Sequence, residues 1–136
     1  MGLFAVSEAN ATEAEAQYNE LTHTAGTMRL FPTLAGDRIL ALLAYTMGNQ
    51  DAAFRHFEDS LSFCRKAGYR PELAWTCCDY ADALFQRAST VSAPTESVED
   101  RAKANLLLDE SLAISSELGM RPLMERVLSR RDILKA

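Results

Sequence analysis

The chain has 136 residues, 48% of them hydrophobic, and a formal net charge of −5. This length suits one domain that buries its own core without a metal or a disulfide to hold it together. The acidic balance argues against direct binding of nucleic acid, because phosphate binding needs an excess of lysine and arginine. No apolar run reaches the length of a membrane span, and no basic segment of a signal peptide precedes the first apolar residues.

Apolar residues at helical spacing, separated by glycine and proline, predict six helices. They are expected at about 8–25, from Pro32 to Gly48, and at about 49–67, 71–88, 97–118 and 122–134. No alternating run rich in valine, isoleucine and threonine occurs, so no strand is predicted. The expected fold class is all-α.

The third of these helices has the clearest buried face, and Gly68 is expected to end it. That face consists of Ala53, Phe54, Phe57, Leu61 and Cys64. The polar segment 89–97 contains Pro94 and is predicted to be a loop, with Ser97 as N-cap of the fifth helix. Leu118 is assigned to the buried stripe of the fifth helix, and Leu128 to that of the sixth.

Part of the sequence occurs twice, with an offset of 51 residues. An acidic pair followed by Ser60-Leu61 and by Gly68-Tyr-Arg-Pro71 returns as Ser111-Leu112 and Gly119-Met-Arg-Pro122. The repeated object is a helix, its glycine stop and the start of the next helix. Short links fold such helices into antiparallel hairpins, which are expected to stack as a short solenoid.

These residues resemble the tetratricopeptide repeat. In that family a large and then a small residue mark the helix crossing, a glycine precedes the second helix, and that helix carries small, large and small residues. The matching positions are Leu40, Ala41, Gly48, Ala53, Phe57 and Ser60 in one repeat, and Tyr80, Ala81, Ala88, Ala104, Leu108 and Ser111 in the next. Ala88 replaces the glycine, and Ala41 and Ala81 lie 40 residues apart where the family has 34.

The resemblance implies a single domain, residues 1–136, folded as a right-handed solenoid of the tetratricopeptide type. Its parts are a capping helix (about 8–25), a first repeat (about 32–68), a second repeat (about 71–119, with the loop 89–97) and a second capping helix (about 122–134). The longer repeat is similar to the C-terminal repeats of bacterial adenylate or guanylate cyclases and of LuxR-type ATP-binding transcriptional regulators. This similarity implies a regulatory arm.

The family binds partners in a groove lined by the first helix of each repeat. Carried onto this chain, the groove positions are Arg38, Leu42, Tyr45, Trp75, Cys78, Asp82 and Phe85. Charged and aromatic side chains of this kind anchor a peptide or a partner helix. The alternative is that Trp75 and Phe85 belong to the core and are covered by the capping helices.

The predicted function is therefore protein–protein interaction without catalysis, in a signalling or transcription-regulating protein. The alternatives are a sensor that holds a small metabolite near Trp75 and Tyr45, and a purely architectural spacer. No phosphate-binding loop, nucleophile elbow or zinc-protease motif occurs, so neither enzyme activity nor a cofactor is expected.

Cys64, Cys77 and Cys78 form no metal-binding or redox motif, which predicts reduced thiols and a cytoplasmic setting. Glu20 and His23 have the spacing of a di-iron ligand pair, but His56 lacks an acidic residue three positions earlier. No metal site is therefore predicted, and both histidines are interpreted as partly exposed. Residues 1–28 are acidic and residues 119–136 mainly basic, which favours either head-to-tail homo-oligomers or simply solvated helix faces.

Overall fold

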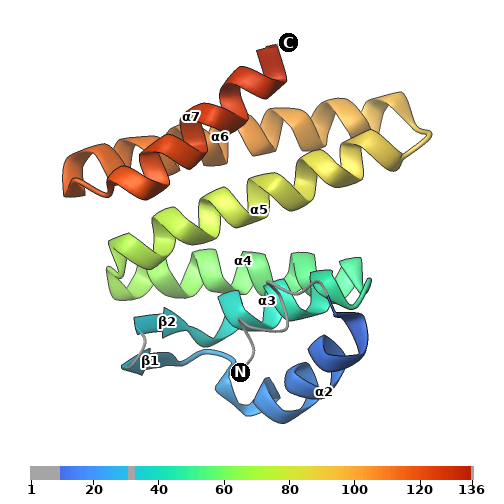
Figure 1. The fold of residues 1–136 in the computed structure, drawn as a ribbon, viewed down its shortest axis with the longest axis vertical. Coiled ribbons are helices and arrows are strands. Elements are labelled where there is room, and N and C mark those ends of the chain that lie inside the picture. Colours follow the sequence, from blue (N-terminus) through green and yellow to red (C-terminus); the bar gives the residue numbers. More distant parts are fainter. Residues whose placement is uncertain (1–9, 31–32, 136) are drawn as a thin grey trace. The chain divides into compact units, whose positions relative to one another are not determined.

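The computed structural model describes residues 10–30 and 33–135 (Figure 1). The chain divides into two units, Met1–Gly68 and Tyr69–Ala136, and each is described by itself. The boundary between them lies between the two predicted repeats, 32–68 and 71–119.

The first unit contains a helix followed by a 3₁₀ turn, a hairpin and two further helices. In chain order these are α2 (Ala11–Leu21), the 3₁₀ turn η1 (Thr22–Thr24), β1 (Met28–Leu30), β2 (Thr33–Ala35), α3 (Gly36–Thr46) and α4 (Gln50–Ala67). The second unit consists of α5 (Arg70–Thr90), α6 (Pro94–Leu118) and α7 (Arg121–Lys135). The described residues thus form six α-helices, and the prediction of an all-α protein with about six helices is confirmed.

The expectation that the chain has no strands was wrong in one place. Strands β1 and β2 form an antiparallel ladder in which Met28 pairs with Ala35 and Leu30 with Thr33. Helix α3 consequently begins at Gly36, later than predicted. A Cβ at Gly36 would lie 1.8 Å from the carbonyl oxygen of Thr24, so the close approach of these two backbones requires glycine here.

The first helix is shorter than predicted, because η1 replaces its last turn. Asn10 caps α2 by accepting a hydrogen bond from the backbone N–H of Glu13. The predicted start of this helix at Glu8 and the predicted role of Pro32 lie outside the described residues.

The prediction of a loop over residues 89–97 was also wrong in its length. Only residues 91–93 separate α5 from α6. Ala88 cannot end a helix as glycine would, so α5 continues to Thr90. Pro94 occupies the first turn of α6, where its missing N–H costs nothing. Ser97 is therefore inside the helix, and its hydroxyl donates to the carbonyl of Ala88 instead of capping α6.

The predicted face of α4 is confirmed, because all five of its residues are buried. Gly68 ends the helix with a φ of 75°, in the left-handed region that glycine adopts without strain. Two other assignments were wrong. Leu118 and Leu128 are 43% and 46% exposed, respectively, because each lies outside the face along which its helix packs.

Small residues allow the helices of each hairpin to approach closely. Ala41 and Ser60 in the first unit, and Ala81 and Ser111 in the second, are completely buried. The Ser111 hydroxyl also donates a 2.8 Å hydrogen bond to the carbonyl oxygen of Ala74, which joins α6 to the backbone of α5. Such crossings have no room for a longer side chain.

The Arg-Pro pair that begins α5 fastens that helix to the end of α6. Two nitrogens of Arg70 donate to the two carboxylate oxygens of Glu117, at 2.7 and 2.6 Å. This bidentate pair lies beside Gly119, where α6 ends. Arg121 holds the corresponding position at the start of α7.

We predict that Ala81→Leu lowers the free energy of unfolding by about 1–3 kcal/mol, because the added atoms overpack the crossing of α5 and α6. Urea unfolding of the full chain measures this loss. Ala102→Leu, at an exposed position on α6, is the matched control and should change the value by less than about 0.5 kcal/mol. Equal effects of the two substitutions would contradict the close crossing.

Candidate functional site

The structure places the predicted groove residues on two helices. Arg38, Leu42 and Tyr45 lie on α3 in the first unit, where Arg38 is buried and the other two are partly buried. Trp75, Cys78, Asp82 and Phe85 lie on α5 in the second unit. Of these four only Cys78 is completely buried.

Helix α7 is attached to this part of α5 by an arginine between two aspartates. The Nη2 atom of Arg126 lies 3.0 Å from Asp79 Oδ1 and 2.8 Å from Asp82 Oδ2. The guanidinium carbon is also 6.0 Å from the centre of the Trp75 ring, within the range of a cation–π contact. Arg126 therefore contacts the ring and both carboxylates through one planar group.

A second arginine follows one turn later on α7. The Nε of Arg130 donates a 2.8 Å hydrogen bond to Asp82 Oδ1. This bond does not use the two terminal amino groups of the guanidinium, and 43% of the side chain is exposed. Those amino groups are available to a carboxylate on another molecule.

The two helices run in the same direction, because two successive hairpins separate them (Figure 1). Phe85 follows Asp82 by one turn of α5, and Ile133 follows Arg130 by about one turn of α7. Phe85, which is partly buried, therefore follows the ion pairs on α5, and 62% exposed Ile133 follows them on α7. We define the α5–α7 face as Trp75, Asp82, Phe85, Arg126, Arg130 and Ile133.

At this face, burial and neighbouring charges shift the pKa values of Arg126 and Cys78 in opposite directions. Burial alone lowers the pKa of Arg126, but the carboxylates of Asp79 and Asp82 more than offset it, so the pKa lies above its usual range. Burial raises the pKa of the Cys78 thiol to about 12; the positive charge of Arg126 only partly opposes this. Cys78 is therefore a protonated core side chain at neutral pH.

Sequence reasoning found three members of the α5–α7 face and missed Arg126, Arg130 and Ile133. From the sequence, the basic residues of 119–136 are expected either to favour head-to-tail association or simply to form solvated helix faces. In the structure Arg126 and Arg130 pair with α5, and Arg131 pairs with Asp109 of α6. Their spacing could have indicated this pairing. Asp79 and Asp82 lie three residues apart on one face of α5, and Arg126 and Arg130 lie four residues apart on one face of α7.

A different polar cluster lies in the first unit. The Nδ1 of His56 is 3.3 Å from Asp37 Oδ1, and its Nε2 is 2.9 Å from the hydroxyl of Tyr18. His56 is only 9% exposed. The expectation that it is a partly exposed residue was therefore wrong, whereas His23 is exposed as predicted.

Near the C-terminal end of α5, a hollow of about 240 Å³ is lined by Arg87, Glu96, Glu99 and Asp100. Two nitrogens of Arg87 donate to the two carboxylate oxygens of Asp100, at 2.7 and 2.6 Å. The hydrogen bonds to Asp100 raise the pKa of Arg87. Because these two groups satisfy each other, the pair fastens α5 to α6.

Comparison with protein-family models, with curated proteins and with solved structures gives no match. The resemblance to tetratricopeptide repeats therefore stays a prediction from the residues. Among the helices of residues 10–30 and 33–135, none combines the length and the apolar character needed to cross a bilayer.

We predict that the three cysteines of the native protein react slowly with thiol reagents, because all three are completely buried and thiolates, not thiols, are the nucleophiles. Labelling with a chromogenic disulfide at pH 8 measures this. All three should react at once after unfolding in guanidinium chloride. Rapid labelling of Cys78 in the folded chain would contradict the packing of α7 over α5.

Proposed function

We propose that this protein is a non-catalytic interaction module that binds a partner protein at the α5–α7 face. The observation behind the proposal is that Arg130 contributes one N–H to Asp82 while 43% of its side chain stays exposed, and that exposed Ile133 follows it by about one turn of α7. The role proposed for the module is that of a regulatory arm in a bacterial signalling or transcription-regulating protein. Its proposed setting is the cytoplasm, and its proposed architecture is a solenoid of the tetratricopeptide type.

The composition of the face supports binding of a protein. Tryptophan and arginine are the residues most enriched among those that dominate interface energies, and both occur here in contact. Trp75 and Phe85 supply aromatic surface, and Ile133 supplies an aliphatic side chain. Because Asp79 and Asp82 hold Arg126 in place, little side-chain entropy is lost when a partner binds.

The proposed occupant is an amphipathic helix that carries acidic residues beside its apolar ones. Its apolar residues would cover Phe85 and Ile133, and a carboxylate would take the terminal amino groups of Arg130 in a bidentate pair. Over residues 121–135 α7 has five lysines and arginines against two acidic residues. Three of these arginines already pair with aspartates of α5 and α6, so the preference for an acidic partner rests on the exposed part of Arg130.

Direct nucleic-acid binding is not part of the proposal, because Arg126, Arg130 and Arg131 all pair with aspartates of the same unit. A row of phosphates needs cations without such partners. Association through oppositely charged ends is not proposed as the main mode of binding, since these pairs already neutralise much of the basic segment.

The test uses a display library of amphipathic helical peptides of about 20 residues, selected against the full chain. We predict that selected peptides place an acidic residue within one turn of their apolar residues. Ile133→Asp should weaken their binding at least about tenfold, as expected for a residue at the centre of an interface. Arg130→Gln should do the same.

Two matched controls separate this face from general effects. Leu106→Asp introduces the same charge at a 70% exposed leucine of α6, and Arg101→Gln removes an exposed arginine of that helix. Both should leave binding unchanged. If these controls weaken binding as much as Ile133→Asp and Arg130→Gln, or if no peptide is enriched, the α5–α7 face is not the binding site.

A further inference from the structure

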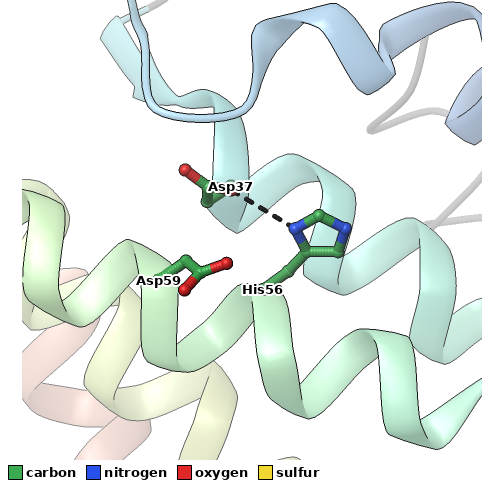
Figure 2. Close-up of side chains that lie close together, drawn as sticks. All are labelled: Asp37, His56 and Asp59. Carbon is green, nitrogen blue, oxygen red and sulfur yellow. Dashed lines mark hydrogen bonds and ion pairs between the residues drawn. The ribbon is translucent and has the colours of Figure 1, made fainter.

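The first unit holds three potential metal ligands close together. Asp37 lies in the first turn of α3, and His56 and Asp59 lie one turn apart on α4. One carboxylate oxygen of each aspartate and one ring nitrogen of His56 lie within 4.8 Å of one another. Figure 2 shows the side chains of His56 and Asp59 projecting from α4 toward Asp37.

Two of these three side chains are buried and oriented by groups outside the cluster. His56 Nε2 is 2.9 Å from the hydroxyl of Tyr18, and the backbone N–H of Gly26 donates a 2.6 Å hydrogen bond to Asp37 Oδ2. Each contact uses the atom that faces away from the cluster. Outer contacts of this kind fix the orientation of histidine and carboxylate ligands in metal sites.

We propose that Asp37, His56 and Asp59 form a binding site for a divalent transition metal, with Zn²⁺ as the best match. This proposal is independent of partner binding at the α5–α7 face, because the two sites belong to different units. One imidazole and two carboxylates suit Zn²⁺ better than Ca²⁺ or Mg²⁺, which prefer oxygen ligands alone.

The distances fit a zinc ion. With bonds of about 2.0 Å, neighbouring ligand atoms of a tetrahedral site lie about 3.3 Å apart. Asp37 Oδ1 and His56 Nδ1 are separated by 3.3 Å, so an ion can bridge them without movement of either helix. Asp59 is exposed and can rotate its carboxylate to complete the third contact. Its exposure also leaves the fourth position to water.

Besides the rotation of the Asp59 carboxylate, binding requires a shift of protons at His56 and Tyr18. Without metal, His56 Nδ1–H can donate to Asp37 while Nε2 accepts from the Tyr18 hydroxyl. With metal, the Nδ1 lone pair binds the ion, the ring proton moves to Nε2, and Nε2–H donates to the Tyr18 oxygen. The ring carries one proton in both arrangements, and the Tyr18 hydroxyl proton turns outward.

A metal at this place would clamp the start of α3 to the middle of α4. Because the ion would bind only the folded unit, it would raise the melting temperature in proportion to the logarithm of its concentration. The site would also connect α2 to the same centre through Tyr18.

Isothermal titration of the metal-free full chain with ZnCl₂ tests the proposal. We expect one equivalent to bind, and Asp59→Asn to weaken binding at least about tenfold. This variant should fold normally, because Asp59 is exposed. Asp51→Asn makes the same change at an exposed position of α4, and His23→Gln removes the exposed histidine; both should bind as the wild type does.

Co²⁺ provides a second readout that identifies the ligands. We expect visible d–d bands without the intense near-ultraviolet thiolate band that cysteine ligation produces, and loss of the d–d bands in Asp59→Asn. The proposal fails if Zn²⁺ does not bind, if Ca²⁺ binds as tightly, if a thiolate band develops, or if Asp59→Asn and Asp51→Asn bind Zn²⁺ equally.

Discussion

In the second unit, the buried carboxylate of Asp79 needs a positively charged partner, and Arg126 of α7 is that partner. Asp79 is only 5% exposed, and an ionised carboxylate so far from water is costly unless it is paired. Arg126 supplies that charge from α7, and the same guanidinium reaches Asp82 and the Trp75 ring. This pairing therefore joins α7 to α5, and Arg130 adds a second hydrogen bond to Asp82 one turn later.

Each unit therefore has a buried polar centre that joins two helices, besides other buried polar side chains such as Asp100 in the second unit. In the first unit it is Asp37 with His56, and in the second it is Asp79 with Arg126. Throughout the described residues, every buried side-chain nitrogen or oxygen has a hydrogen-bond partner. Such satisfied centres fix which faces of the helices meet.

Local sequence patterns predicted the helices well, because helix periodicity and glycine stops act over a few residues. The buried face of α4 and the stop at Gly68 are examples. Strands of three residues such as β1 and β2 carry too few positions to show alternation, so they could not be predicted. The length of α5 was missed because Ala88 was matched to a glycine position, although alanine favours continuation of a helix.

The candidate sites were less predictable, since they join residues far apart in the chain. His56 and Asp37 belong to different helices, and only their packing buries the imidazole. Likewise the charges of Arg126 and Asp82 are visible in the sequence, but their pairing depends on how α7 crosses α5. Trp75, Asp82 and Phe85 were identified because the repeat pattern specifies which face of α5 they occupy.

A double-mutant cycle between Asp79 and Arg126 tests the central pairing most directly. The free energies of unfolding of the wild type, Asp79→Asn, Arg126→Met and the double variant give the coupling between the two side chains. The pairing predicts a coupling of about 1–2 kcal/mol, with the double variant less destabilised than the sum of the singles. A coupling below about 0.3 kcal/mol, within the range of independent sites, would contradict it.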